Sequence, residues 1–191
     1  AMSEKGPKAM HARMQESHPT LERWLDLPVP TVAAVNGPAA GAGFSLAIAS
    51  DFIFAGKKAR FIMSFGRIGL VPDWGAMYIL PRLVGMQRAK ELVLTAREVS
   101  VQEAHDLGLV LKIVEDDRLL GYTQEFAAKF SNASPTAIGI AKRVIGSTFE
   151  ADRTTALAAE ANAQVEANAS DYHRAAVKRF LAKEPALFNW T

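Results

Sequence analysis

The feature that most limits how this chain can fold is a short apolar run that leads into a segment of small residues. Residues 31–35 (TVAAV) are typical of a buried strand, and Asn36-Gly37 is a turn pair. Residues 37–43 contain only glycine, proline and alanine, and a helical run over residues 44–50 follows. The sequence therefore predicts a buried strand, a tight loop and a helix in direct succession.

Such a loop has a chemical use. The first N–H groups of a helix lack partners within the helix and lie at the positive end of its dipole. Small side chains let a ligand approach that backbone closely, so the loop can hold an anion or a developing oxyanion. The alternative is a tight turn whose glycines only pack against a neighbour. A Walker loop is excluded because no Gly-Lys-Ser/Thr follows, and Leu46 breaks the dinucleotide-binding spacing.

The remaining pattern mixes strands and helices in the first part and contains helices alone in the last. Proline at position 19 predicts two short helices within residues 4–26 rather than one. Ser100 and Glu103 form a capping-box pattern, and Ser134 is an expected N-cap. The other expected strands are residues 51–55, 59–63 and 109–114. The other expected helices are residues 74–84, 87–95, 118–130, 135–145, 151–169 and 171–183.

Composition removes several classes of function. The 22 basic and 20 acidic residues leave a net charge of +2, which does not favour a nucleic-acid partner. There is no cysteine, and the four histidines lack the spacing of metal ligands, so we expect no metal site. No apolar run reaches the ~20 residues of a membrane span, and residues 1–10 lack the apolar core of a signal peptide. We therefore expect a cytoplasmic protein that does not enter membranes.

Spaced motifs in a fixed order carry a family resemblance. Residues 32–43 (VAAVNGPAAGAG), followed by Leu46-Ala47 and Asp51, resemble the signature of the enoyl-CoA hydratase/isomerase (crotonase) superfamily. The similarity extends over about residues 28–188. Further matching motifs are residues 59–61 (ARF), 69–72 (GLVP), 80–85 (LPRLVG), 89–92 (AKEL), 103–104 (EA), 108–110 (GLV) and 180–183 (FLAK).

The resemblance implies a fold and an assembly. It implies an α/β, crotonase-like fold with a ββα spiral core over residues 1–118 and a helical oligomerisation region over residues 119–191. The family's N-terminal strands are expected to be absent, so the chain resembles a family member without them, either a fragment of a longer protein or a degenerate member. A homotrimer or dimer of trimers is implied, and alanine-rich faces within residues 151–183 would suit packing between subunits.

The resemblance also implies a substrate and part of an oxyanion hole. An acyl-CoA thioester would bind with its carbonyl oxygen at two backbone N–H groups, and no cofactor beyond the substrate's coenzyme A is implied. One donor maps to Ala42, between the substrate-binding residues Gly41 and Gly43. The second donor and part of the adenine pocket belong to an upstream loop, which has no counterpart here. Arg60, Arg67 and Arg82 are candidates for phosphate contacts, although each is individually a common surface residue.

The carboxylates are where the chain departs from the hydratases of this family. Their two glutamate positions map to Ser45 and Phe65, neither of which can act as a general base. Asp73, in the sequence Val-Pro-Asp-Trp-Gly, matches the aspartate of isomerase branches, where one base moves a proton between two carbons. Phe65, Trp74 and Gly75 are then expected to line the substrate site, with the apolar side chains excluding water and raising the pKa of Asp73.

Three alternatives stay open at this point. Asp73 is also suited to N-capping a helix that begins at residue 74. A hydratase with altered catalytic residues is an alternative to an isomerase. It is also compatible with a non-catalytic acyl-CoA-binding member of the family.

Overall fold

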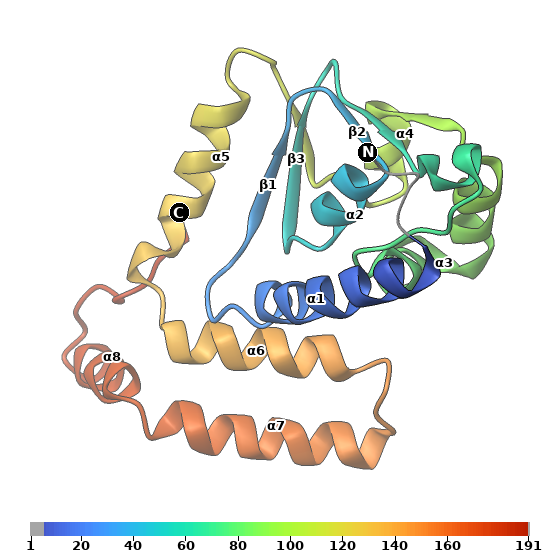
Figure 1. Ribbon diagram of the computed structural model, residues 1–191. Coiled ribbons are helices and arrows are strands. Elements are labelled where there is room, and N and C mark those ends of the chain that lie inside the picture. The colour runs from blue at the N-terminus through green and yellow to red at the C-terminus, as the bar shows by residue number, and fades with distance from the viewer. Residues whose placement is uncertain (1–5, 191) are drawn as a thin grey trace. The chain divides into compact units, whose positions relative to one another are not determined.

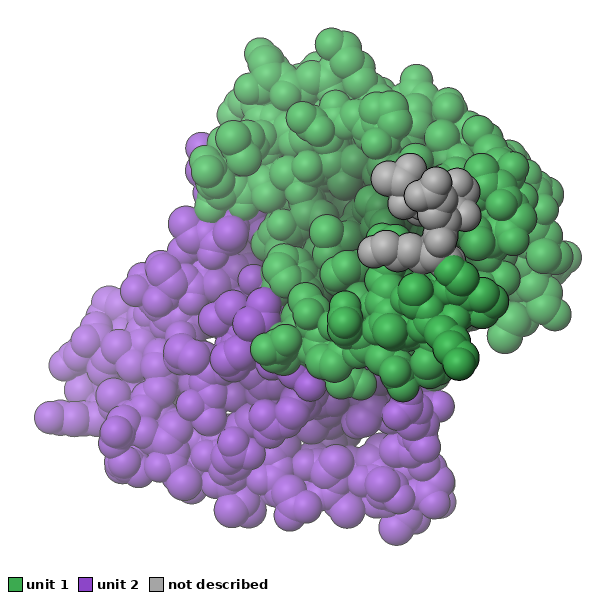
Figure 2. All heavy atoms as spheres, viewed as in Figure 1, with its two compact units in different colours: residues 1–25, 31–124 green, residues 26–30, 125–191 purple. Residues whose placement is uncertain are grey.

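A computed structural model describes residues 6–190 and divides them into two compact units. The first contains the described residues up to Leu25 together with Thr31–Gln124, and the second contains Asp26–Pro30 and the described residues from Glu125 onward. Figure 2 colours the two units. All described strands belong to the first unit, whereas the second is helical (Figure 1).

Two small sheets organise the first unit. One has the order β1-β3-β6 with all strands parallel, and the other has the order β2-β4-β5, in which β2 and β4 are parallel and β5 is antiparallel. The strands are β1 (Val32–Val35), β2 (Pro38–Ala40), β3 (Phe52–Gly56), β4 (Arg60–Ile62), β5 (Glu98–Ser100) and β6 (Lys112–Val114).

The order of pairing is that of a spiral. The chain crosses from the first sheet to the second along β1 and β2, and then does so again along β3 and β4. The second crossing pairs with the first in parallel register, with Ala34 opposite Phe54 and Ala39 opposite Phe61. This repeat confirms the predicted α/β, crotonase-like architecture with its ββα spiral.

Strands β2 and β5 are absent from the sequence prediction. Strand β2 is only Pro-Ala-Ala, within the segment predicted to be a loop, and it has neither alternation nor β-branched residues. It is a strand because β4 lies beside it, and the N–H of Gly41 extends the contact by donating to the carbonyl of Ile62 at 2.9 Å. Distant pairing therefore overrides local propensity here.

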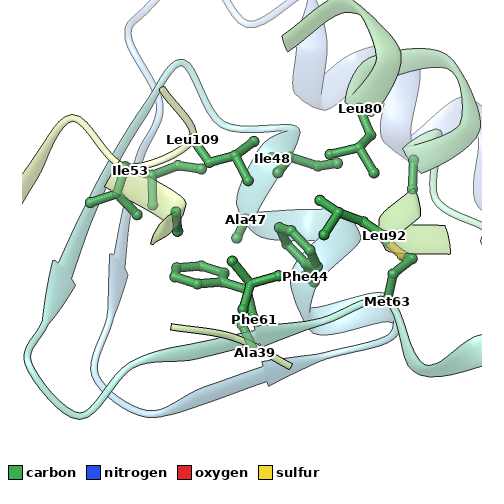
Figure 3. Packing of buried hydrophobic residues seen from close by; sticks show 14 of the residues in the cluster. Ala39, Phe44, Ala47, Ile48, Ile53, Phe61, Met63, Leu80, Leu92 and Leu109 are labelled. Carbon is green, nitrogen blue, oxygen red and sulfur yellow. The ribbon is translucent and has the colours of Figure 1, made fainter. Parts of the chain in front are cut away.

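Helix α2 (Ala42–Ile48) supplies the centre of the core. Its Phe44, Ala47 and Ile48 are buried, and the ring of Phe44 lies 5.3 Å from that of Phe61 on β4. Figure 3 shows these side chains packed with residues of α3 and of both sheets. Burying one such side chain contributes roughly 1.5–3 kcal/mol, so this contact area fixes α2, and with it the loop that precedes it.

Helix α1 (Pro7–Leu25) corrects the prediction of two short helices. It continues through Pro19 as one helix, and residues 4 and 5 of the predicted segment lie outside the described residues. Leu21 is buried, and Trp24 Nε1 donates to the carbonyl of Ala49 at 3.1 Å. Packing on the C-terminal side of Pro19 therefore compensates for the backbone hydrogen bond that proline removes.

Helices α3 (Ala76–Thr95) and α4 (Val101–Asp106) follow the predicted boundaries more closely. Gly85, with φ 77° and ψ 159°, breaks α3 into the two helical stretches that the sequence indicates. Ser100 N-caps α4, since its hydroxyl accepts from the Glu103 N–H at 3.2 Å. The Glu103 carboxylate does not complete a capping box but instead binds Arg97.

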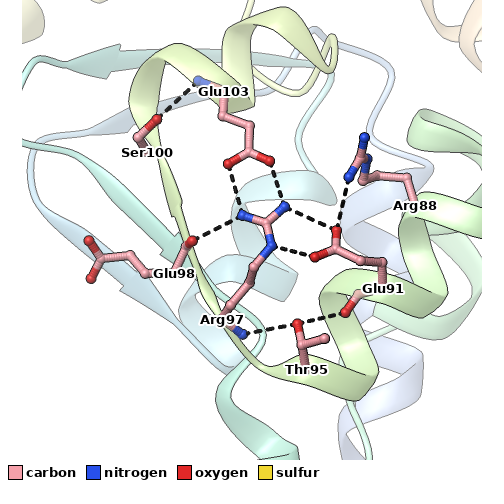
Figure 4. A network of polar contacts seen from close by, with 7 residues as sticks. All are labelled: Arg88, Glu91, Thr95, Arg97, Glu98, Ser100 and Glu103. Carbon is pink, nitrogen blue, oxygen red and sulfur yellow. Dashed lines mark hydrogen bonds and ion pairs between the residues drawn. The ribbon is translucent and has the colours of Figure 1, made fainter.

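The side chain of Arg97 connects α3, α4 and β5. Arg97 lies two residues after the end of α3, and its guanidinium donates two hydrogen bonds each to Glu91 of α3 and Glu103 of α4 (Figure 4). It also donates to the carbonyl of Glu98 on β5 at 3.2 Å. The side chains of Arg97, Glu91 and Glu103 are about one-third exposed, so this Arg97 network is half-buried.

Helix α5 (Leu119–Ala128) leads from the first unit into the second. There, Ser134, Asp152 and Ser170 each accept a backbone N–H as N-caps. The segment Asp26–Pro30 belongs to this unit because Pro28 packs on α6, where a Cβ added to Gly139 would lie 2.9 Å from that of Pro28. The remaining helices are η2 (Lys129–Asn132), α6 (Pro135–Ser147), α7 (Arg153–Asn168) and α8 (Asp171–Leu181).

Candidate active site

The backbone at Gly41 forms the turn from β2 into α2. Its φ of 54° and ψ of −122° lie where residues with a side chain are strained, and an added Cβ would lie 3.2 Å from Ser64 Oγ. Helix α2 then begins at Ala42, which is exposed, as is Gly43. The first N–H groups of α2, including that of Ala42, therefore have no acceptor within their own helix, and no atom would meet a Cβ on Gly43 within 4 Å.

The structure brings Phe65 and Ser45 against this same turn. Phe65, in the 3-10 helix η1 (Ser64–Ile68), is buried, and its ring atoms lie 3.7 Å from the position of a Cβ on Gly41. Ser45 is completely buried, and its hydroxyl donates to the Gly41 carbonyl at 3.3 Å. The two positions that the family resemblance maps to the glutamates of hydratases therefore hold a packed ring and a hydroxyl within the helix.

A second turn, with left-handed backbone, follows Asp73. Trp74 has φ 50° and Gly75 has φ 73°, and Gly75 is the N-cap residue of α3. The Ala76 N–H donates to the backbone carbonyl of Asp73 at 3.1 Å, and the α3 N-terminus has no side-chain cap. The alternative in which Asp73 caps the helix is therefore wrong, and its carboxyl group is left for another role.

The Asp73 carboxyl group is half-buried and poorly solvated. Its Oδ1 atom is buried and has no hydrogen-bond partner among the described residues. Burial raises the pKa of Asp73 above its ordinary value, and the charges of Arg13 and His18 on α1, with the residue's own backbone N–H, oppose that rise. A carboxyl group in this state takes up a proton more readily than one in water.

Trp74 and Gly75 tie this turn to the rest of the unit. Trp74 is half-buried and packs against the core cluster. A Cβ on Gly75 would lie 2.6 Å from Leu21 Cδ2 of α1, so only glycine permits this approach. The sequence identified Asp73, Trp74 and Gly75 but not the residues of α1 beside them, because the apolar positions of that helix indicate a packing face without naming its partner.

The three arginines considered for phosphate contacts bind neighbouring groups of their own unit. Arg60 donates to the Ala59 carbonyl at 2.7 Å, and Arg67 Nε donates to the Ala96 carbonyl at 3.0 Å. Arg82 donates to the Tyr78 carbonyl at 2.8 Å, with its guanidinium 3.5 Å from the centre of the Tyr78 ring. Their described contacts are thus structural.

Residues 6–190 contain no group of three or more histidine, aspartate or glutamate side chains arranged to hold a metal ion. None of their helices combines the length and apolar character that a membrane span requires.

Comparison with known proteins identifies the family. The Enoyl-CoA hydratase/isomerase family matches residues 1–191. The chain is 36% identical over 171 residues to 1,2-epoxyphenylacetyl-CoA isomerase of Escherichia coli, covering 90% of this chain and 65% of that protein. It is 36% identical over 157 residues to short-chain-enoyl-CoA hydratase of Clostridium acetobutylicum, covering 82% of this chain and 60% of that protein. The chain thus spans about two thirds of the length of such relatives.

Solved structures agree with the sequence match. An enoyl-CoA hydratase/isomerase from Cupriavidus metallidurans superposes with a TM-score of 0.92 at 40% identity, over 97% of this chain and 70% of that one. An enoyl-CoA hydratase from Bacillus anthracis superposes with a TM-score of 0.88 at 30% identity, over 99% of this chain and 73% of that one. The chain belongs to the enoyl-CoA hydratase/isomerase family.

Proposed function

We propose that this chain is the catalytic part of an acyl-CoA isomerase. It would shift a double bond, or rearrange a ring, in an enoyl-CoA thioester through an enolate, with Asp73 as proton shuttle. The observation that carries the proposal is the buried, unpartnered Oδ1 of Asp73, in a chain whose other two candidate positions hold Ser45 and Phe65. One base suffices for proton migration, whereas the two-glutamate hydration mechanism lacks both of its carboxylates.

In the proposed reaction, the thioester oxygen accepts a hydrogen bond from the Ala42 N–H at the start of α2. That donor stabilises the negative charge that develops on the oxygen when a proton leaves the α or γ carbon. Asp73 takes this proton, the C–H electron pair forms the enolate, and Asp73 returns the proton to the other carbon as the double bond moves. The raised pKa of Asp73 favours this two-way exchange.

The other proposed site residues shape the space around these two groups. Gly41 and Gly43 leave room for the thioester beside the α2 N-terminus, and the Phe65 ring makes the adjoining wall apolar. Trp74 and Gly75 set the direction of Asp73 through their backbone. Coenzyme A is part of the substrate in this scheme, and no other cofactor is required.

A second candidate is an enoyl-CoA hydratase with altered catalytic residues. It is favoured by the relatives themselves, since the similar proteins include a named hydratase as well as a named isomerase. A third, non-catalytic acyl-CoA-binding role is the outcome if the chain binds thioester without turnover. The products distinguish the first two, because hydration adds water and gives a 3-hydroxyacyl-CoA, whereas isomerisation conserves the substrate's mass.

We also propose that the protein is a cytoplasmic homotrimer or dimer of trimers assembled through its helical region. Supporting this, an open groove of about 630 Å³ in the second unit is lined mainly by apolar side chains, among them Ala137, Val177, Phe180 and Leu187. Phe180 is 81% exposed, which is unusual for a large apolar side chain. Light scattering of the purified protein tests the assembly, and a monomer at micromolar concentration would contradict it.

The decisive experiment compares Asp73→Asn with the unchanged chain on enoyl-CoA substrates. Double-bond migration should fall by at least ~100-fold, the loss typical of a removed general base, while thioester affinity stays within about twofold. Asp106→Asn, an exposed carboxylate on α4, is the matched control and should be fully active. Unchanged turnover in Asp73→Asn would refute the base assignment, and formation of 3-hydroxyacyl-CoA would favour the hydratase.

A further inference from the structure

The turn at Gly41 directs the Ala42 N–H into the space that a side chain on Gly41 would fill. With ψ at −122°, the peptide group after Gly41 is rotated so that its nitrogen is nearly eclipsed with the Cβ position. Standard backbone dimensions then place an oxygen that accepts a hydrogen bond from the Ala42 N–H about 2.4 Å from that position. Glycine is therefore required here for a second reason besides its φ of 54°, because a Cβ would collide with any such oxygen.

The Ser64 hydroxyl borders this same space. Ser64 Oγ lies 3.2 Å from the Cβ position of Gly41, and two atoms of the Phe65 ring lie 3.7 Å from it. Sheet pairing explains the approach, since β2 and β4 are parallel with Ala40 opposite Ile62, and both chain segments turn just beyond the carboxyl ends of these strands. The Gly41 N–H fixes the turn against β4 by donating to the Ile62 carbonyl at 2.9 Å.

The local structure makes no use of the Ser64 hydroxyl. The residue is half-buried, its hydroxyl forms no hydrogen bond within residues 6–190, and it does not cap η1, which has no side-chain cap. Ser45, on the other side of the turn, differs because its hydroxyl donates to the Gly41 carbonyl at 3.3 Å. A serine hydroxyl carries one hydrogen that rotates toward its acceptor. That of Ser64 is therefore available to an oxygen placed beside Gly41.

We propose that Ser64 is a catalytic residue whose hydroxyl donates a second hydrogen bond to the thioester oxygen, beside the bond from the Ala42 N–H. This inference rests on the proposed function, because it assumes that an acyl-CoA thioester binds at this turn. When a proton leaves the α or γ carbon, the C–H electron pair forms the enolate and negative charge develops on the oxygen. Hydrogen bonds to an ionised acceptor are about twice as strong as those between neutral groups, so both donors act most on the enolate. Ser64 keeps its own proton throughout.

The first test is Ser64→Ala in the full chain. The kcat for double-bond migration should fall by roughly 100-fold, the lower end of the loss for one removed oxyanion donor, while KM stays within about twofold. Urea unfolding should be unchanged, because the hydroxyl has no partner among the described residues. Unchanged turnover would overturn the inference. A loss of stability that accompanies the loss of activity would also overturn it, since the role would then be structural.

Ser131→Ala is the matched control. Ser131 is an exposed serine in another 3-10 helix, η2, and its hydroxyl also forms no hydrogen bond within residues 6–190. The substitution removes the same atom far from Gly41 in the sequence and should leave kcat and KM unchanged. An equal loss of activity in both variants would overturn the inference.

A second readout requires no turnover. Butyryl-CoA, labelled with carbon-13 at the thioester carbonyl, has no double bond to migrate, and hydrogen bonds to its oxygen move the carbonyl resonance downfield when it binds. This displacement should be smaller in Ser64→Ala than in the wild type, and unchanged in Asp73→Asn and Ser131→Ala. An equal displacement in the wild type and Ser64→Ala would show that the hydroxyl does not reach the oxygen, and the inference would be wrong.

The two readouts separate this inference from the assignment of the base. If Asp73→Asn stays active while Ser64→Ala lowers both kcat and the carbonyl displacement, the proposed base is wrong and the role of Ser64 stands. If Asp73→Asn is inactive and Ser64→Ala changes neither quantity, the base stands and this inference fails. If butyryl-CoA does not bind the wild type, or binds without a displacement, the thioester site itself is wrong and both proposals fail.

Discussion

Replacement of Arg97 by methionine tests how much the Arg97 network in Figure 4 contributes to stability. Methionine keeps most of the apolar stem of the side chain and removes only the guanidinium. The loss covers two two-point contacts, including bonds of 3.0 Å to Glu91 and 2.8 Å to Glu103, and a bond of 3.2 Å to the Glu98 carbonyl. It also leaves two carboxylates facing the same space with no cation between them.

The magnitude follows from exposure. Fully exposed ion pairs contribute about 0–1 kcal/mol, whereas hydrogen bonds to charged groups in drier surroundings contribute more. With side chains about one-third exposed, each two-point contact is assigned roughly 1 kcal/mol, so Arg97→Met should lower the free energy of unfolding by about 2 kcal/mol. For a chain of this length that corresponds to a decrease in Tm of about 4–8 °C.

The pH dependence gives an independent check. Hydrogen bonds from Arg97 hold the pKa values of Glu91 and Glu103 below their usual range. A lowered carboxylate pKa contributes stability that is complete above the unfolded value, about 4.3 for glutamate, and is lost as pH falls through the folded value. The difference between wild type and Arg97→Met should therefore be full at neutral pH and close progressively below about pH 4.3.

Urea unfolding followed by circular dichroism at several pH values measures both effects. Arg143→Met is the matched control, because Arg143 contacts Glu166 at 3.4 Å with both side chains more than half exposed, and we expect no measurable change. Equal losses in the two variants would refute the argument from exposure. A deficit in Arg97→Met that does not depend on pH would show that lost packing, not the ion pairs, is responsible.

Two further substitutions test the backbone at Gly75 and the hydrogen bonds of Thr31. Gly75→Ala should lower the free energy of unfolding by about 2 kcal/mol or more, because Gly75 has a φ of 73° and its added Cβ would lie 2.6 Å from Leu21. Gly146→Ala, in open space on α6, is the control and should stabilise the protein by about 0.5–1 kcal/mol. Equal effects of the two substitutions would contradict the conformational argument. Thr31→Val should lower the free energy of unfolding by about 1–2 kcal/mol. The buried Thr31 hydroxyl donates to the Asp51 carboxylate at 2.9 Å and accepts from the Asp51 N–H at 3.0 Å, and valine removes both hydrogen bonds. Unchanged urea unfolding would show that water replaces the hydroxyl.

Much of the first unit is predictable from local pattern. The predicted runs at residues 31–35 and 59–63 contain β1 and β4, and the run at residues 51–55 covers β3 except for its last residue, Gly56. Ser100 and Ser134 cap the helices that follow them. These succeed because the burial and capping involved are local to each segment. Strand β2 was not predictable, since three residues of Pro-Ala-Ala acquire a strand conformation only from β4 beside them.

The candidate site shows a different limit. The residue types at Ser45, Phe65 and Asp73 are visible in the sequence, and the family resemblance gives them meaning. Asp73 does not cap α3 because the two residues after it, Trp74 and Gly75, have left-handed backbone conformations. A φ of 50° is rare for tryptophan, so the sequence does not predict it at Trp74. The approach of α1 to this turn depends on the packing of Leu21 against Gly75, two residues some fifty positions apart in the chain.

Three aspartates of this chain differ in the hydrogen bonds that their carboxylates accept. Asp51 accepts the Thr31 N–H at 2.7 Å, and Asp152 accepts the Thr155 N–H at 2.7 Å, which holds the pKa of Asp152 below its usual range. The Thr155 N–H stabilises the ionised form of Asp152, so this carboxylate is poorly suited to exchange a proton. Asp73 differs, because its Oδ1 atom is buried without a hydrogen-bond partner among the described residues and burial raises its pKa. Because the Asp73 carboxyl group caps no helix and its Oδ1 accepts no hydrogen bond from residues 6–190, its removal should affect turnover more than stability.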